Sequence, residues 1–251
     1  FTGQKSGGRH FLRNDLNEII NYRIMNRTML KAILFDFGGT LDCDGIPWKE
    51  RFYPLYRDAG IDWDLSSFER FFYASDDSLT AEKLDAVGYE ATILEQVNRV
   101  LRNGDSYDAM LARRIADRFY SESLRCLNRN KPLLRRLSER YRLGIVSNFY
   151  GNLEFLCAEI GYARFLTAVI DSARVGTTKP NAGIFLAALE QLGCAPGQAV
   201  LVGDNPVRDM RGARALAMPH IWLNGLDPDR EPCCEGDPVI RSLAELGEIV
   251  L

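Results

Sequence analysis

The sequence ILFDFGGTLD, residues 33–42, places an acidic residue directly after a short apolar run. An apolar run that ends at turn residues is typical of a buried β-strand, so Asp36 is expected at the carboxyl end of a strand. Gly38 and Gly39 follow, and their lack of side chains lets a ligand approach the backbone closely. The stretch therefore predicts a strand whose end forms part of a binding site.

Similar apolar runs occur later in the chain and alternate with helical patterns. Including the first, the predicted strands are residues 30–35, 142–147, 167–172, 199–203 and 220–223. The helical patterns between the later strands are residues 152–161, 182–193 and 207–217. This alternation predicts a doubly wound α/β fold, in which helices cover both faces of a parallel sheet.

The segment between the first two predicted strands breaks the alternation, because its apolar residues recur at helical spacing. The predicted helices are residues 47–60, 66–75, 80–102, 106–127 and 131–140. We therefore expect a helical domain at residues 44–128, inserted into an α/β core domain that residues 29–43 and 129–251 form. Residues 1–28 are interpreted as an N-terminal extension.

The amino-acid composition indicates which classes of binding partner are disfavoured. The chain has 31 basic and 34 acidic residues, a net charge of −3, which favours neither a nucleic-acid nor a membrane partner. No apolar run has the length needed to span a bilayer and no signal peptide is recognisable, so we expect a cytoplasmic protein. The six cysteines show no CxxC spacing and are interpreted as free thiols. The oligomeric state is left open between monomer and homodimer.

Polar residues follow each predicted strand, at the sheet edge where open α/β folds bind ligands. They comprise carboxylates, a hydroxyl, an amide and an ammonium group, and they are Asp36, Ser147, Asn148, Lys179, Asp204 and Asp209. Asp36 can attack phosphorus, and Asp36 with Asp204 can hold Mg²⁺, which prefers oxygen ligands. Ser147 and Lys179 can bind phosphoryl oxygens, where negative charge develops. The set predicts a phosphate site.

Four short motifs in this order resemble those of the haloacid dehalogenase-like superfamily, and the resemblance covers about residues 30–225. The motifs are DFGGT at 36–40, SN at 147–148, KP at 179–180 and GDNPVRD at 203–209. The inserted helical domain resembles the C1-type cap of that family. The resemblance implies that Asp36 is the nucleophile and that Asp36, the Gly38 carbonyl and Asp204 bind Mg²⁺.

The same resemblance implies roles for the remaining motif residues. Asp209 would support the metal site. The residues expected to bind substrate are Gly39, Thr40, Ser147, Asn148 and Lys179, and those expected to act in catalysis are Asp36, Ser147 and Lys179.

Gly38 departs from the family pattern, which usually has a second aspartate there to donate and accept a proton. A missing general acid typically costs 10²–10⁴-fold in rate, so we expect a preference for leaving groups that depart as stable anions. Asp42, Asp44 or a cap residue could replace the acid. Asp42 and Asp44 are nevertheless interpreted as solvated residues at the hinge into the cap. The cap aromatic residues are interpreted as packing rather than as substrate contacts; they are Trp48, Phe52, Tyr53, Tyr56, Phe71, Phe72 and Tyr73.

These features predict a Mg²⁺-dependent phosphatase that acts on a small phosphorylated metabolite through an aspartyl phosphate on Asp36. One alternative is a phosphonatase, which would need a cap lysine such as Lys49 or Lys83. Another is a dehalogenase, against which Asp204 argues. A third is a phospho-ligand-binding protein impaired by Gly38. A Ser–His–Asp hydrolase is disfavoured, because His220 lies in a predicted strand away from any nucleophile motif.

Overall fold

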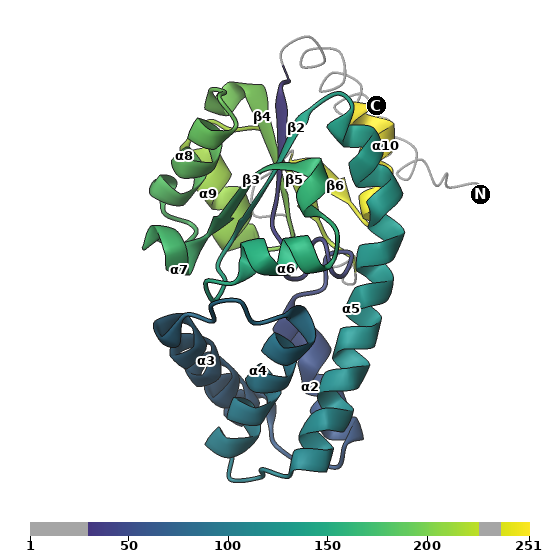
Figure 1. Ribbon diagram of the computed structural model, residues 1–251, viewed down its shortest axis with the longest axis vertical. Helices are drawn as coiled ribbons and strands as arrows, with labels where there is room; N and C mark the ends of the chain where they lie inside the picture. The colour runs from purple at the N-terminus through teal and green to yellow at the C-terminus, as the bar shows by residue number, and fades with distance from the viewer. Residues whose placement is uncertain (1–29, 226–236) are drawn as a thin grey trace, which may run out of the picture.

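The computed structural model describes residues 30–225 and 237–251, which contain a parallel sheet of six strands in the order β3-β2-β1-β4-β5-β6 (Figure 1). The strands are β1 (Ala32–Phe35), β2 (Arg142–Ser147), β3 (Leu166–Asp171), β4 (Ala199–Gly203), β5 (His220–Leu223) and β6 (Val239–Ile240). The five predicted strands are confirmed to within two residues at each end. The sequence reading missed β6, because two residues are too few to show a periodic pattern.

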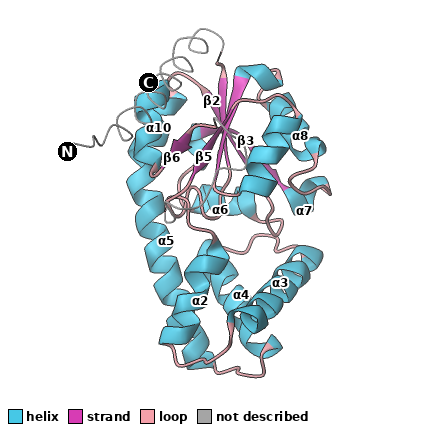
Figure 2. Ribbon diagram, turned by 180° about the vertical axis from the view of Figure 1, so that it is seen from behind, coloured by secondary structure: helices cyan, strands magenta, loops and turns pink. Residues whose placement is uncertain are grey.

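Helices cover both faces of this sheet, as the doubly wound fold requires (Figures 1 and 2). Ile33 and Phe35 of β1 pack on the face covered by α6 (Leu153–Glu159), α10 (Leu243–Val250) and part of α5 (Ala109–Ser138). Ala32 and Leu34 pack on the opposite face, against α8 (Ala182–Gln191) and α9 (Arg211–Ala215). Burial on both faces explains why β1 reads as a continuous apolar run rather than an alternating one.

Shorter elements complete the core. They are η1 (Ala163–Phe165), α7 (Ser172–Val175), η2 (Pro196–Gln198) and the π-helical turn η3 (Pro206–Met210). The predicted helix at 207–217 is therefore η3 followed by α9.

The helices between β1 and β2 lie at the end of the sheet toward which β1 runs (Figure 1). They are α2 (Trp48–Asp58), α3 (Leu65–Glu82), α4 (Tyr89–Asn103) and α5. The predicted helix at 80–102 is wrong at its start, because α3 extends to Glu82 and a turn separates it from α4. Two further predicted helices, 106–127 and 131–140, form one continuous helix, α5. We refer to residues 44–128 as the cap, and their end at 128 lies inside α5.

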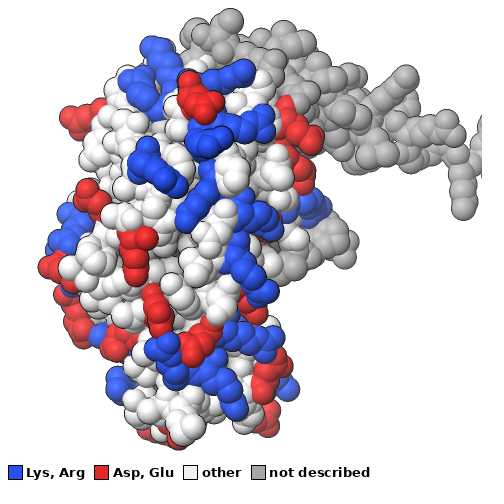
Figure 3. All heavy atoms as spheres, turned by 45° about the vertical axis from the view of Figure 1, so that its right-hand side comes forward, with Lys and Arg blue, Asp and Glu red and all other residues white. Residues whose placement is uncertain are grey.

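Helix α5 connects the cap to the core along the length of the molecule (Figure 1). Its buried residues recur at helical spacing from Ala112 to Leu137, so one face packs inward along the whole helix. It carries eight Lys and Arg residues and two Asp and Glu residues, and Figure 3 shows basic side chains gathered along this side of the molecule. Across the described residues, no helix combines the length and apolar character needed to cross a bilayer.

Candidate active site

Asp36 lies at the carboxyl end of β1, where a neighbouring strand and a loop direct polar groups toward it. One of its oxygens, Oδ1, accepts hydrogen bonds from Ser147 Oγ at 2.6 Å and from the backbone N–H of Phe37 at 2.7 Å. Lys179 Nζ lies 2.7 Å from the same oxygen. None of the described residues hydrogen-bonds the other oxygen, Oδ2. The two oxygens of this carboxylate thus differ, because only Oδ1 is held by neighbouring groups.

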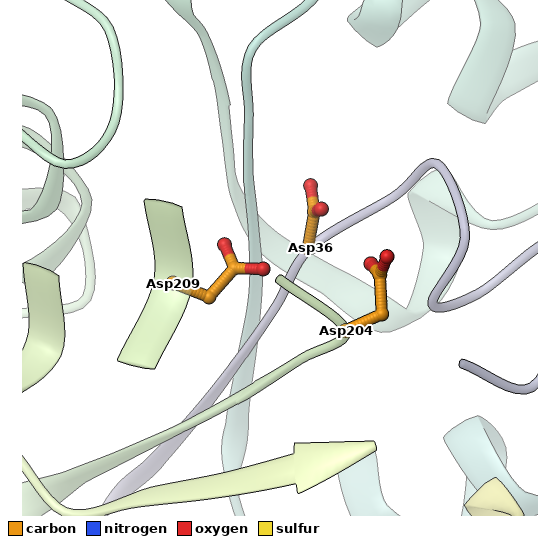
Figure 4. A group of neighbouring side chains, drawn as sticks. All are labelled: Asp36, Asp204 and Asp209. Atoms are coloured by element: carbon orange, nitrogen blue, oxygen red, sulfur yellow. The ribbon is translucent and has the colours of Figure 1, made fainter. Parts of the chain in front are cut away.

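Asp204 and Asp209 come from the segment after β4 and complete a group of three buried carboxylates with Asp36 (Figure 4). Each contributes an oxygen, and these oxygens lie within 4.8 Å of one another. Thr40 Oγ1 donates to Asp204 Oδ1 at 2.9 Å, and Lys179 Nζ lies 2.6 Å from Asp209 Oδ1. Lys179 is the ammonium group that contacts two of the three acids.

Burial and mutual repulsion shift the pKa values of the acids in this group. Burial, followed by the charges of Asp36 and Asp209, raises the pKa of Asp204 well above its usual range. Burial also raises the pKa of Asp209 to about 6, although Lys179 opposes that shift. Burial disfavours the charge on Lys179, but Asp209 and Asp36 keep its pKa above the usual value. The raised pKa values mean that the three acids resist being ionised together beside a single ammonium group, and a divalent cation bound between them would favour their ionised forms.

Two glycines of the first motif have different neighbours. Gly39 has a positive φ of 86°, and a Cβ there would lie 2.6 Å from Asp204 Oδ2, so only glycine fits beside the carboxylate group. At Gly38 a Cβ would lie 3.1 Å from Nε1 of Trp48, a residue of α2. Close approach of a ligand to this backbone stays a prediction, since the nearest neighbour of Gly39 is a site carboxylate. At Gly38 the nearest neighbour is a cap side chain.

The amide of Asn148 holds the backbone of Lys179. Asn148 Oδ1 accepts from Lys179 N at 2.7 Å, and Asn148 Nδ2 donates to Lys179 O at 3.2 Å. The loop after β2 therefore fixes the segment that carries the lysine. Thr40, which is fully buried, supports Asp204 through its hydroxyl group.

A cavity of about 530 Å³ lies between the sheet end and the cap. The predicted site residues that line it are Asp36, Gly38, Ser147, Asn148, Lys179 and Asp204. From the cap, Trp48, Lys49, Phe72, Tyr73 and Asp76 line it too. Trp48 and Phe72 also belong to the buried apolar core, in line with the interpretation of the cap aromatic residues as packing. Tyr73 is 43% exposed and packs in no core, whereas Phe52 and Tyr56 are buried.

Asp42 is fully buried, so its interpretation as a solvated hinge residue was wrong. Its Oδ1 accepts from Gly39 N at 2.6 Å, and its Oδ2 accepts from Trp48 Nε1 at 2.7 Å. Oδ2 also accepts from Arg51, Tyr89 and Ser123. These donors come from α2, α4 and α5, so no short stretch of sequence contains the pattern.

Asp44 is only partly exposed and is also bonded rather than freely solvated. It pairs with Arg129 Nη2 at 2.5 Å and accepts from the backbone N–H of Leu243 at 3.3 Å. It therefore links the start of the cap to α5 and α10.

Asp76, on α3, is an acid in the cavity wall that the sequence reading did not identify. Its Oδ1 accepts from Tyr150 Oη at 2.5 Å and from Gln96 Nε2 at 3.0 Å. Burial raises the pKa of Asp76 to about 6. The Asp76-Asp77 pair in a helical pattern does not show which of the two faces a cavity.

The remaining sequence predictions concern His220 and the cysteines. His220 begins β5 and its Nε2 lies 3.1 Å from Asp237 Oδ2, and it is not among the described residues that line the cavity. Cys43, Cys126, Cys157 and Cys194 are free thiols, as predicted. Cys233 and Cys234 lie outside the described residues.

The profile of the haloacid dehalogenase-like hydrolases matches residues 30–216. The chain belongs to this family, which confirms the resemblance inferred from the four motifs. It is 39% identical over 92 residues to a phosphoserine phosphatase of Thermus thermophilus, across 36% of this chain and 35% of that protein. It is 35% identical over 98 residues to a glyceraldehyde 3-phosphate phosphatase of Methanothermobacter thermautotrophicus, across 39% of this chain and 43% of that protein. The chain thus spans less than half the length of either relative.

Two solved structures show the same fold over most of the chain. A haloacid dehalogenase-like phosphatase from Thermococcus onnurineus is 26% identical with a TM-score of 0.54, covering 88% of this chain and 97% of that one. A dehalogenase is 17% identical with a TM-score of 0.61, again covering 88% of this chain and 97% of that one. The second likeness concerns the fold alone.

Proposed function

We propose that the protein is a Mg²⁺-dependent phosphatase that hydrolyses a small phosphorylated metabolite through an aspartyl phosphate on Asp36. The observation that carries the proposal is the Asp36 carboxylate itself. Ser147 and Lys179 hold its Oδ1, while Oδ2 faces no hydrogen-bond donor among the described residues. A carboxylate oriented in this way beside an ammonium group is suited to attack phosphorus. The two phosphatases named above support the same class of reaction.

The residues around Asp36 fit the charge that a phosphoryl group brings. Lys179 and Ser147 would bind the phosphoryl oxygens, where charge develops in the transition state. Asn148 would act indirectly, because its amide bonds both backbone groups of Lys179. Gly39 and Thr40 would shape the loop that holds Asp204.

A divalent cation fits the three buried acids because, once all three are ionised, their charge exceeds that of Lys179 by two. Asp36, Asp204 and the Gly38 carbonyl would hold Mg²⁺, and Asp209 would support them. When bound, the cation would lower the repulsion between Asp36 and an anionic phosphoryl group.

Two alternatives fit the structure less well. A dehalogenase would have no use for the excess of buried negative charge at Asp204 and Asp209. A phosphonatase needs a neutral cap lysine to form a Schiff base. Burial opposes the charge on Lys49, but its hydrogen bond to Glu69 raises the Lys49 pKa, which keeps it protonated. Lys83 is not among the described residues that line the cavity.

The test is phosphate release from a panel of phosphorylated metabolites and p-nitrophenyl phosphate, by chelator-treated protein with and without added Mg²⁺. We expect turnover that requires Mg²⁺ and that Asp36→Asn abolishes without loss of the fold. Asp62→Asn, the same change in an exposed cap loop, is the matched control and should keep full activity. Beryllium fluoride should mimic the acyl phosphate on Asp36 in wild type and not in Asp36→Asn.

Turnover by Asp36→Asn at the rate of wild type would contradict the nucleophile assignment. Full activity in excess chelator would favour the dehalogenase-like alternative. A phosphorylated metabolite that binds without any release of phosphate would favour the impaired binding protein.

A further inference from the structure

The proposed reaction leaves one chemical requirement unmet, because Gly38 has no side chain to move a proton. The space beside Gly38 is not open to a substitute group either. Trp48 Nε1 would lie 3.1 Å from a Cβ at Gly38, and this indole nitrogen donates to Asp42. A proton donor for the leaving group has to come from another wall of the cavity.

Four carboxyl groups line the cavity among the described residues: Asp36, Glu50, Asp76 and Asp204. Asp36 is the proposed nucleophile and Asp204 the proposed metal ligand. Glu50 is exposed at the start of α2. Asp42 does not line the cavity, and both of its oxygens accept hydrogen bonds. Asp76 is the remaining candidate.

We propose that Asp76 is the general acid and general base of the reaction, in place of the second aspartate that Gly38 lacks. This inference rests on the proposed phosphatase function. It assigns a catalytic role to a residue of the cap, outside the four motifs.

The geometry around Asp76 matches that role. Tyr150 and Gln96 both donate to Oδ1, which fixes the carboxyl group. Oδ2 has no hydrogen-bond partner among the described residues, so it is available to a ligand in the cavity. Tyr150 belongs to the loop after β2, three residues beyond Ser147 at the end of that strand, so one short segment contacts both Asp36 and Asp76.

The position of α3 also matches the direction of the reaction. In-line displacement places the leaving oxygen on the side of phosphorus opposite the nucleophile. Asp36 lies at the sheet end, and the cap helices lie beyond that end (Figure 1). The leaving group is therefore directed toward the cap wall, to which Asp76 belongs.

The acidity of Asp76 suits proton transfer near neutral pH. Burial raises its pKa to about 6, against the opposing effects of Tyr150, Arg208 and Gln96, while the neighbouring Asp77 adds to the rise. A catalytic pKa near the working pH allows one group to donate a proton and then to accept one.

The two proton transfers balance over the reaction. As the bond from Asp36 Oδ2 to phosphorus forms and the bond from phosphorus to the leaving oxygen breaks, protonated Asp76 donates its proton to that oxygen. The product leaves as a neutral alcohol. The Asp76 carboxylate then accepts a proton from the water that attacks the aspartyl phosphate. That attack breaks the bond between phosphorus and Asp36 and releases inorganic phosphate.

The test compares kcat/KM for alkyl phosphates, such as glycerol phosphate, with kcat/KM for p-nitrophenyl phosphate. Asp76→Asn keeps an oxygen for Tyr150 and Gln96 but cannot move a proton. We expect it to lower kcat/KM for alkyl esters by about 10²–10⁴-fold and that for p-nitrophenyl phosphate by less than about tenfold. Asp62→Asn makes the same charge change in an exposed cap loop away from Asp76 and should preserve the wild-type ratio.

Tyr150→Phe gives a second measurement that a purely structural role would not affect. Tyr150 lowers the pKa of Asp76 through its hydrogen bond, so its removal should raise that pKa further. The alkaline limb of the pH profile for alkyl esters should then move to higher pH.

An equal loss on both classes of ester in Asp76→Asn would overturn the proposal and assign Asp76 to substrate binding. Wild-type kcat/KM on both classes of ester in Asp76→Asn would overturn it as well, and both results would leave the phosphatase function intact. A wild-type protein that releases no phosphate from any ester would refute the proposed function, and the role of Asp76 with it.

Discussion

At the scale of single residues, a cap side chain limits which residue can occupy position 38 of the first motif. The first-motif loop and α2 meet there, with Trp48 against the glycine and bonded to Asp42. The absence of the second aspartate is thus coupled to the packing of Trp48. A carboxylate at position 38 and the indole in its present place would compete for the same volume.

Gly38→Asp is therefore expected to destabilise the protein rather than to restore a donor. Overpacking of this kind costs about 1–3 kcal/mol, and kcat/KM for alkyl phosphates should not rise. Urea denaturation and the alkyl ester assay measure the two effects. Gly197→Asp is the matched control, because no atom lies within 4 Å of a Cβ at Gly197, and its stability should be close to that of wild type. A gain in alkyl phosphate turnover by Gly38→Asp would contradict this account.

The sequence predicted that the core residues of the site gather at the sheet end, and it did not identify Asp76 in the cavity wall. Asp36, Ser147, Lys179 and Asp204 each lie close to the end of a strand or in a short motif, so their convergence follows from the topology of a parallel sheet. Asp76 lies within a helix, where only the rotation of α3 against the core decides which side chain faces the cavity. That rotation depends on packing between distant segments, which periodicity alone does not determine.

At the scale of elements, Asp42 joins the loop after β1 to three cap helices. Gly39 N, Arg51 of α2, Tyr89 of α4 and Ser123 of α5 all donate to its carboxylate. The Arg51 and Asp42 side chains are only 5% and 0% exposed, so water cannot replace either partner. This buried network fixes the start of the cap against its own helices.

Removal of Asp42 should leave the buried Arg51 guanidinium without its carboxylate. Loss of one partner of a buried pair costs about 3–5 kcal/mol, so Asp42→Ala should lower the free energy of unfolding by that amount. Asp58→Ala, in the cap, is the matched control. Asp58 and its partner Arg118 are 58% and 55% exposed, and loss of such a pair costs about 0–1 kcal/mol. Chemical denaturation of the two variants should separate them, and equal losses would refute the role of Asp42.

Helix ends were predicted less well than helix positions, for identifiable reasons. Pro132 lies inside α5, and the sequence reading broke the helix near it, whereas the buried face runs through from Ala112 to Leu137. The break between α3 and α4 is a turn in which Lys83 and Ala86 have positive φ. A lysine or an alanine in a sequence does not predict a positive φ, because such φ values usually favour glycine.

At the scale of the whole molecule, the site is held between two parts that share one apolar core. A single cluster of buried residues extends from Ile33 and Phe35 in the sheet to Phe52 and Phe119 in the cap helices. Polar contacts cross the same boundary, including Tyr150 to Asp76 and Asn152 to the backbone of Val87. A ligand that binds at the sheet end should therefore influence the stability of the whole fold.

The three buried acids should lower the stability of the metal-free protein, because burial and the neighbouring carboxylates disfavour the charge on Asp204. In Asp204→Asn the amide oxygen can still accept from Thr40, while one of three mutually repelling carboxylates is removed. We expect the metal-free variant to melt at a higher temperature than metal-free wild type. Mg²⁺ should stabilise wild type, by about 2.7 kcal/mol at a hundred times its dissociation constant, and should not stabilise the variant. Thermal melts with and without Mg²⁺ test both parts, with Asp62→Asn expected to behave as wild type. A variant that Mg²⁺ stabilises as much as wild type would show that the cation binds elsewhere, since the carboxylate it is proposed to need is gone.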